Sequence, residues 1–290
     1  MCTFYDFIYR MYFAFKKSGV ERLLRRSQRA GRGLDQVKRL IRRNLWVQVQ
    51  SGLSQGMWMQ LRLPSEGEYW RGTHEPHVQS AISAAVRPGS VVYDIGAHLG
   101  SMALGTARLV GDAGRVVAFE GDPENVTRLR DNASRNGLKD RLQVVHAAVW
   151  SYNRSEGICF RRGQTVRSQG GVEANGNRPV VGSGEVINVP TVTLDNFIAA
   201  GGPVPQLVKI DVEGGEYQVL RGGANLFASQ KPLIIAEIHH RQAAEQVSAW
   251  LEEYRYCSGW NTPPEGFPRY LFAWPTGYDG AGWMRSSANT

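Results

Sequence analysis

The stretch "VVYDIGAHLGSMAL", residues 91–104, gives the strongest indication of how this chain folds. It begins with a short apolar run that is typical of a buried strand, and its second half places apolar residues at helical spacing. Between these parts stand one acid, Asp94, and two glycines, Gly96 and Gly100. Glycine lets the backbone turn sharply into a helix and approach a ligand closely. The stretch therefore predicts a strand, a ligand-binding loop and a helix in succession.

The same alternation of strand and helix patterns continues as far as residue 275. Strands are predicted at 91–96, 115–122, 142–150, 206–212 and 232–240, with a closing pair at 256–260 and 269–275. Helices are predicted at 100–110, 123–137, 193–200, 215–223 and 241–254. This alternation indicates an α/β fold with a doubly wound, mostly parallel sheet that is covered by helices on both faces. Ligands in such folds bind beyond the carboxyl ends of the strands.

The segments around this series have other patterns. Residues 45–63 alternate apolar and polar side chains on both sides of a Ser/Gly/Gln turn, which predicts a β-hairpin. Residues 75–86 have a helical pattern, and 151–189 form a Gly-, Ser-, Asn- and Arg-rich excursion with one or two strands. We therefore divide the chain into a basic helical N-terminal extension, residues 1–44, and one domain, residues 45–290.

The positive charge of the chain is concentrated at its N-terminus. The net charge is +8, and residues 1–43 alone contain twelve Lys or Arg and three acids. This segment is too short and too interrupted to span a bilayer, and it lacks the order of a signal peptide. We expect a helix that packs on the domain, with peripheral contact to an anionic membrane surface as the alternative. No nucleic-acid partner is expected, because no recognised nucleic-acid motif accompanies the charge.

The three cysteines, Cys2, Cys159 and Cys257, are odd in number and far apart. Their spacing argues against a disulfide framework and against a zinc site, and it fits a reducing compartment. We expect a cytoplasmic protein, with the inner face of a membrane as the alternative location.

The loop after the first strand of this series has the spacing D-x-G-x-x-x-G. This differs from the G-x-G-x-x-G pattern that cradles the pyrophosphate of a dinucleotide. Glu120 follows Asp94 by twenty-six residues and ends the next predicted strand, where a carboxylate can accept both hydroxyls of a ribose. The two features predict a nucleoside cofactor without pyrophosphate, and S-adenosyl-L-methionine fits that description. In the structural alternative, Asp94 caps a helix and Glu120 is a solvated strand end.

Five segments carry a resemblance to a known family: "VVYDIGAHLGSMAL", "VVAFEGDPENVTRLRDN", "VPTVTLDNF", "LVKIDVEGGEYQVLRGG" and "PLIIAEIHH". In this order, over residues 45 to 275, they resemble the FkbM-type methyltransferases. The resemblance implies a Rossmann-like, seven-stranded sheet of the class I methyltransferase type and S-adenosyl-L-methionine as cofactor. Several members of that family O-methylate hydroxyls on sugars or polyketides.

The resemblance also implies a set of cofactor-binding residues. They are Asp94, Gly96, Ala97, Gly100, Glu120, Gly121, His146 and Ala147. His146 and Ala147 are included because they end the third predicted strand, where such folds flank the adenine. The family usually has asparagine where this chain has His98. That departure affects the role of the side chain, whereas the loop is expected to bind through its backbone.

Methyl transfer to a hydroxyl requires an oriented acceptor and a group that helps to remove its proton. Asp211, Glu237 and His239 are the catalytic candidates. Asp211 ends the strand expected beside the first strand of the sheet, and Glu237 and His239 alternate on one face at the end of the next predicted strand. His239 suits a base because its ordinary pKa is nearest neutral. Glu213 and Glu75 are candidates for contact with the substrate. The structural alternatives are a helix-capping role for Asp211 and a solvent-exposed position for His239.

Two further charges in "VKIDVEGGEY" are given structural roles. Lys209 lies inside a strand and needs an acidic partner, for which we expect Glu237 or Asp211. Glu216 falls in a first helical turn, where an acid is stabilised by the helix dipole. We expect no metal, although Asp211, Glu237 and His239 form an alternative oxygen-rich divalent site.

These observations predict an S-adenosyl-L-methionine-dependent O-methyltransferase that acts on a hydroxyl of a glycan or a secondary metabolite. Two alternatives remain open from the sequence. One is a nicotinamide-dependent oxidoreductase, which the missing G-x-G-x-x-G pattern disfavours. The other is a non-catalytic membrane-surface adaptor that retains the fold and binds through residues 1–43. The sequence does not indicate an oligomeric state.

Overall fold

The computed structural model describes residues 44–161, 186–261 and 266–278. The chain divides into two compact units, Met1–His74 and Glu75–Thr290. Most of the predicted N-terminal extension and the middle of the 151–189 excursion lie outside the described residues. The proposed boundary at residues 44 and 45 stays a prediction. No helix in the described part of the chain is long and apolar enough to cross a membrane.

The described part of the first unit contains the predicted hairpin. Strands β1 (Asn44–Gln48) and β2 (Trp58–Arg62) pair antiparallel, with Asn44 opposite Arg62 and Gln48 opposite Trp58. A short helix, α4 (Gly67–Arg71), follows the hairpin, and the sequence had not indicated it. The alternating pattern therefore gave the correct strands here.

The second unit is built on a seven-stranded sheet. Its strands, in the order in which they pair, are β11 (Tyr256–Trp260), β12 (Arg269–Pro275), β10 (Leu233–Ile238), β9 (Leu207–Ile210), β3 (Val91–Ile95), β4 (Arg115–Glu120) and β5 (Leu142–His146). Strands β10, β9, β3, β4 and β5 run parallel, and β12 pairs antiparallel with both β10 and β11. The prediction of a doubly wound, mostly parallel sheet is confirmed.

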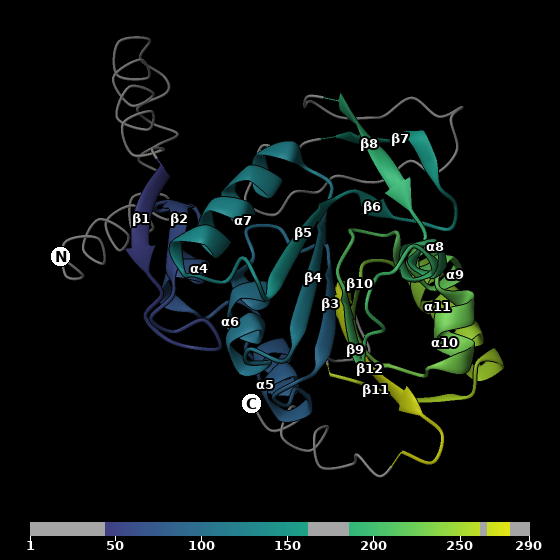
Figure 1. The fold of residues 1–290 in the computed structure, drawn as a ribbon. Helices are drawn as coiled ribbons and strands as arrows, with labels where there is room; N and C mark the ends of the chain where they lie inside the picture. The colour runs from purple at the N-terminus through teal and green to yellow at the C-terminus, as the bar shows by residue number, and fades with distance from the viewer. Residues whose placement is uncertain (1–43, 162–185, 262–265, 279–290) are drawn as a thin grey trace. The chain divides into compact units, whose positions relative to one another are not determined.

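Helices cover both faces of this sheet (Figure 1). One side carries α5 (Pro76–Ala85), α6 (Ser101–Leu109) and α7 (Pro123–Arg135). The other side carries α8 (Leu194–Ala199), α9 (Glu216–Gly222), α10 (Ala224–Ser229) and α11 (Arg241–Glu253). Among these helices only α10 had not been predicted. Local signals set several helix starts: Pro123 opens α7, and the Asp122 side chain accepts a hydrogen bond from the Glu124 amide at 2.7 Å.

The core lies between the sheet and these helices. Tyr93 on β3, Phe119 on β4 and Phe197 on α8 meet edge to face, with ring centroids 5.1 to 5.8 Å apart. Tyr93 and Phe119 are both buried. Each such aromatic pair contributes roughly 0.5–1.5 kcal/mol beyond the area that it buries. The three rings therefore hold α8 against the face formed by two central strands.

The predicted strand at 142–150 is corrected by the structure. The chain leaves the main sheet after β5, and β6 (Ala148–Val149) joins a second sheet with β8 (Val186–Val192) and β7 (Arg154–Arg161). The Ala147 amide hydrogen-bonds the Val145 carbonyl in a tight turn, and the Trp150 amide hydrogen-bonds the Val192 carbonyl. The apolar pattern runs through β5 and β6 without interruption, because each of them lies partly buried in a sheet. The sequence pattern therefore could not indicate where the chain passes from one sheet to the other.

The order of the strands fixes where a ligand should bind. The chain proceeds from β3 outward to β5, then returns to the other side of β3 to form β9 and β10. The switch point therefore lies between β3 and β9, and ligands of doubly wound folds bind at the carboxyl ends of the strands at such a point. Asp94, Glu120, Asp211 and Glu237 all lie at or next to these carboxyl ends.

Candidate active site

The loop between β3 and α6 approaches its neighbours as closely as backbone allows. Gly96 has φ +77°, and a Cβ atom built on it would lie 1.7 Å from the Asp211 carbonyl oxygen. Gly100 has φ +84°, and its Cβ would lie 2.1 Å from a methyl of Leu129. The amides of Gly96 and Ala97 both donate to the Phe119 carbonyl, at 2.9 and 3.0 Å. Both glycines are therefore required by space and by conformation.

His98 stands at the centre of this loop in a left-handed conformation, with φ +51°. Asparagine and histidine are among the few residues that enter this region readily. The loop therefore accommodates histidine where the related family usually has asparagine. The His98 amide donates to Glu120 Oε2 at 2.8 Å, so the loop is held by its backbone.

The Glu120 carboxylate joins the loop to the end of β4. Its Oε2 accepts from the His98 amide, and its Oε1 accepts from the Asp122 amide at 2.8 Å and from Asn125 Nδ2 at 3.4 Å. Burial raises the pKa of Glu120 to about 7, although these hydrogen bonds oppose the shift. The interpretation of Glu120 as a solvated strand end is wrong, because the residue is buried. Each carboxylate oxygen still has acceptor capacity for a hydroxyl.

Three other cofactor candidates lie beside this carboxylate. His146 ends β5 directly opposite Glu120 on β4, and its Nε2 lies 3.1 Å from the Gly121 carbonyl. Ala147 follows in the turn that leaves the sheet. The eight predicted cofactor residues therefore gather at the carboxyl ends of β3, β4 and β5.

Asp94 has a different environment from the one predicted. Asp94 and Lys209 are opposite each other on β3 and β9, so their side chains leave the same face of the sheet. Lys209 Nζ lies 3.3 Å from Asp94 Oδ1 and 3.3 Å from Asp211 Oδ2. The side chains of Asp94 and Lys209 are only 4% and 8% exposed. Asp94 therefore faces a buried lysine and supports the loop from its buried side.

The expectation that Lys209 pairs with an acid is confirmed for Asp211, and Asp94 is a second partner that the sequence did not indicate. Burial lowers the pKa of Lys209, but the facing carboxylates of Asp94 and Asp211 outweigh that effect and raise it above its ordinary value. The lysine therefore keeps its charge. It pairs with Asp94 on β3 and with Asp211 after β9, and so joins the ends of these two strands.

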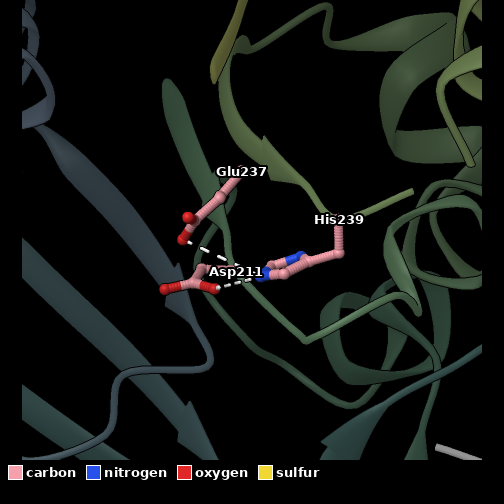
Figure 2. Close-up of side chains that lie close together, drawn as sticks. All are labelled: Asp211, Glu237 and His239. Atoms are coloured by element: carbon pink, nitrogen blue, oxygen red, sulfur yellow. Dashed lines mark ion pairs between the residues drawn. The ribbon is translucent and has the colours of Figure 1, made fainter. Parts of the chain in front are cut away.

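The three catalytic candidates converge beyond the ends of β9 and β10 (Figure 2). Asp211 follows β9, while Glu237 lies in β10 and His239 directly follows it. His239 Nε2 lies 3.8 Å from Asp211 Oδ1 and 3.9 Å from Glu237 Oε2. Figure 2 shows both carboxylates directed toward the imidazole ring. The structure thus brings together the residues that the sequence had grouped.

Glu216 has a role that the sequence did not indicate. It begins α9 as predicted, but its side chain is fully buried. Its Oε1 lies 2.7 Å from His239 Nδ1 and also accepts from the Gly214 amide at 2.8 Å. The predicted place of Glu216 in the first helical turn is confirmed, and its contact with His239 is an additional role. The solvent-exposed alternative for His239 is wrong, since its side chain is 15% exposed.

The two adjacent histidines have separate tasks. His240 is the N-cap of α11, and its Nδ1 accepts from the Ala243 amide at 3.0 Å. Its ring also lies close to the left-handed Gly214 in the turn after β9. This leaves His239 as the histidine that meets the acidic cluster.

The two substrate candidates lie next to this cluster. Glu213 Oε2 is 3.4 Å from His239 Nε2, and its backbone is left-handed, with φ +53°. Glu75, also left-handed with φ +46°, accepts from the Tyr270 hydroxyl at 3.4 Å. Such conformations in non-glycine residues cluster at functional sites. Tyr270, on β12, also hydrogen-bonds Glu237, and the sequence did not indicate it.

The cluster carries more negative charge than its surroundings balance. Burial lowers the pKa of His239, but the hydrogen bond and charge of Glu216, with other nearby carboxylates, raise it to about 9. Burial and the charges of Asp211 and Glu75 raise the pKa of Glu237 to about 9. Glu237 and His239 therefore retain their protons at neutral pH, and the cluster favours a ligand that is positively charged or donates hydrogen bonds.

Comparisons with known proteins agree with this geometry. The family model described as the methyltransferase FkbM domain matches residues 94–257. The hexuronic acid methyltransferase AglP of Haloferax volcanii is 26% identical over 230 residues, which cover 75% of this chain and 89% of that protein. The ribosomal protein L11 methyltransferase of Pelotomaculum thermopropionicum is 48% identical over 60 residues, which cover 21% of this chain and 19% of that protein.

Among solved structures, a methyltransferase FkbM from Methylobacillus flagellatus aligns with a TM-score of 0.46 and 17% identity. The alignment covers 68% of this chain and about half of that protein's length, 54%. The family model alone covers more than half of the chain, from Asp94 near the end of β3 into β11. The chain therefore belongs to the FkbM methyltransferase family and is an S-adenosyl-L-methionine-dependent methyltransferase.

Proposed function

We propose that this protein transfers a methyl group from S-adenosyl-L-methionine to a hydroxyl of a glycan or a related metabolite. The observation that carries the proposal is the cluster of Asp211, Glu237 and His239 beside the glycine loop, at the switch point of the sheet. This chain matches 89% of the length of a relative that is named for action on a hexuronic acid, and that name supports a sugar acceptor.

The residues of the loop fit the proposed cofactor. Gly96, His98 and Gly100 all have left-handed backbones, so the loop turns sharply at the carboxyl end of β3, where a ligand of such a fold binds. Glu120 is held by backbone amides with acceptor capacity to spare, which suits a ribose diol. When bound, the cofactor would supply an electrophilic methyl group on a sulfonium.

The acidic cluster would act on the acceptor. A hydroxyl is a poor nucleophile, so a group that binds it and takes its proton accelerates transfer. Asp211 directly follows β9 and Glu237 lies on the neighbouring β10, so the two can accept hydrogen bonds from adjacent hydroxyls of one sugar ring. Glu216 holds the His239 ring and Lys209 holds Asp211, so the cluster is fixed in place, which is a condition for orienting the acceptor.

The experiment that tests the proposed function uses the purified full chain, tritiated S-adenosyl-L-methionine and a fractionated extract of glycans, small metabolites and proteins. We expect label in the glycan or small-metabolite fraction, and we expect it to resist mild alkali, because a methyl ether does and a methyl ester does not. Label released by alkali would place the methyl on a carboxyl group. Label confined to the protein fraction would favour an activity like that of the ribosomal-protein relative.

Replacing Glu237 with glutamine should lower kcat by about 10²-fold or more, because the amide can no longer share a proton with the acceptor. Affinity for S-adenosylhomocysteine should change less than about twofold, since Glu237 lies on β10, two strands away from the strand that leads into the cofactor loop. Glu245→Gln, an exposed change on α11, is the matched control. An unchanged kcat in Glu237→Gln would remove this residue from the acceptor site.

Affinity for S-adenosylhomocysteine should rise by about tenfold between pH 6 and pH 8. Glu120, with a pKa of about 7, must be ionised to accept both ribose hydroxyls. Burial raises that pKa most strongly and the nearby Asp122 charge adds to the rise, whereas the Asp122 and His98 amides lower it. Calorimetric titration at several pH values checks this expectation.

The variant Glu120→Gln should bind more weakly and should lose this pH dependence. Asp140→Asn, at an exposed position, should keep it. A persistent tenfold change in Glu120→Gln would assign the dependence to another group. For the protein without ligand the sign is opposite: because the folded pKa lies above the usual 4.5, Glu120 lowers stability as pH rises toward 7.

A further inference from the structure

We propose that Asp211, Glu237 and His239 bind one divalent cation of the Mn²⁺ type, which in turn holds the hydroxyl groups of the acceptor. The inference rests on the proposed function and names how its acceptor site recognises a substrate. The three side chains offer one imidazole nitrogen and two carboxylate oxygens, all within 4.8 Å of one another. They come from the adjoining ends of two paired strands, so the backbone fixes their spacing.

The distances within the cluster suit ligands of a shared ion better than direct hydrogen bonds. His239 Nε2 stands 3.8 Å from Asp211 Oδ1 and 3.9 Å from Glu237 Oε2. Both separations exceed the ~3.2 Å limit of a good hydrogen bond. Ligands at about 2.0–2.2 Å from a cation lie about 3 Å apart when adjacent and about 4.2 Å apart when opposite. The two distances from His239 to the carboxylates fall between these limits, and all three ligand atoms lie within 4.8 Å of one another.

Each of the three side chains is also held by a second residue. Glu216 accepts from His239 Nδ1, so the Nε2 edge of the ring faces the centre of the cluster, where a bound cation would take the place of the Nε2 proton. Lys209 holds Asp211 Oδ2 and leaves Oδ1 directed at the imidazole. The Tyr270 hydroxyl hydrogen-bonds Glu237. Metal-ligating histidines and carboxylates have outer partners of this kind, which fix the ring orientation and raise the basicity of the ligands.

Glu216 is the most telling of these partners. Its side chain is fully buried, and its Oε2 has no hydrogen-bond partner among the residues that the structure describes. Burying the Glu216 carboxylate costs desolvation free energy, which an ordinary ion pair with one imidazole does not readily offset. A carboxylate in this position is the usual arrangement behind a metal-bound histidine, whose free nitrogen must keep its lone pair.

The charges around the cluster also call for a cation. Asp211, Glu213, Glu216 and Glu237 lie around a single imidazole. Lys209, the nearest described cation, also serves the buried Asp94. A divalent ion would balance carboxylates that the protein itself leaves in excess.

The donor set favours a cation of intermediate character. Two carboxylates suit Mg²⁺ and Mn²⁺, whereas an imidazole suits transition metals, so Mn²⁺ satisfies all three ligands. Three protein ligands leave positions open for two neighbouring hydroxyls of the acceptor. Coordination would lower the pKa of the reacting hydroxyl. Its proton then passes to Glu213, next to the cluster, as the O–CH₃ bond forms and the C–S bond of the sulfonium breaks.

The experiment uses the metal-free full chain at pH 7.5, titrated with MnCl₂ while electron paramagnetic resonance reports the free ion. We expect one bound Mn²⁺ per chain. Glu237→Gln and His239→Ala should each weaken binding at least tenfold, and Glu216→Gln should weaken it about 10- to 100-fold. The exposed variant Glu245→Gln should bind as the parent does. The proposal is overturned if the parent protein binds no Mn²⁺, or if Glu237→Gln and His239→Ala bind Mn²⁺ as tightly as the parent protein does.

A second measurement needs no variant and so does not depend on how a variant folds. Electron spin-echo modulation of Mn²⁺ bound to the parent protein should show coupling to one imidazole nitrogen. A spectrum without nitrogen coupling overturns the proposal, because the ion then lies elsewhere. Binding of S-adenosylhomocysteine in the same samples separates the two levels of inference. If it binds and Mn²⁺ does not, only the cation site fails; if it does not bind, the proposed function fails.

Discussion

Replacing Gly96 with alanine is expected to abolish binding of S-adenosylhomocysteine and to lower the free energy of unfolding by about 4 kcal/mol or more. The added Cβ would stand 1.7 Å from the Asp211 carbonyl oxygen, which is backbone and cannot turn aside. Relief of the clash would have to separate β3 from β9, which are paired at this point. The left-handed conformation adds about 1–2 kcal/mol for a residue with a side chain.

The matched control is Gly111→Ala. Gly111 also has a left-handed backbone, with φ +65°, but a Cβ there would meet nothing within 4 Å. This variant should lose only the conformational cost of about 1–2 kcal/mol and should keep its affinity for S-adenosylhomocysteine. Urea unfolding and calorimetric titration of both variants check the expectation. Equal losses in the two would show that strain, and not the close approach to Asp211, explains the glycine.

The comparison of the two glycines shows what a sequence can reveal about this site. The glycines and the acid after the first strand of the series predicted a ligand-binding loop, and the loop lies at the switch point of the sheet. The strands and helices were predicted well because each has a strong periodic pattern of its own. The sequence could not distinguish Gly96, which touches backbone, from Gly111, which faces open space.

Contacts between distant segments were harder to predict. Asp211, Glu237 and His239 were grouped correctly, because carboxyl ends of neighbouring parallel strands meet at one edge. The contact of Glu216 with His239 was not predicted, because the local position of Glu216 already offered a sufficient explanation, the start of a helix. Its contact with His239 depends on how α9 packs against the end of β10, which no local pattern contains.

Tyr270 was missed for a related reason. It lies on β12, which returns antiparallel beside β10 and sets Tyr270 opposite Glu237. The apolar segment at 269–275 correctly predicted a strand, but neither its direction nor its register follows from its composition. A tyrosine in such a strand is ordinary core until its register is known.

Replacing Lys209 with methionine is expected to lower the free energy of unfolding by about 3–5 kcal/mol, because it leaves the buried Asp94 without its counter-charge. Asp94→Asn should cost less, since Lys209 keeps Asp211 as a partner. The double variant Asp94→Asn/Lys209→Met should be more stable than the sum of the two losses implies. Urea unfolding of the four proteins gives the coupling energy, and simple additivity would show that Asp94 and Lys209 do not interact.

The pH dependence of Lys209→Met distinguishes a stranded charge from a packing defect. Burial already raises the pKa of Asp94 in the parent protein, although Lys209 opposes the shift, so removal of the lysine should raise the folded-state pKa further. A group with a raised folded-state pKa binds more protons in the folded state, so its contribution to stability is lost as pH rises. The penalty of Lys209→Met should therefore be smaller at pH 5 than at pH 8. A penalty that is the same at both pH values would mean that methionine merely packs poorly beneath the cofactor loop.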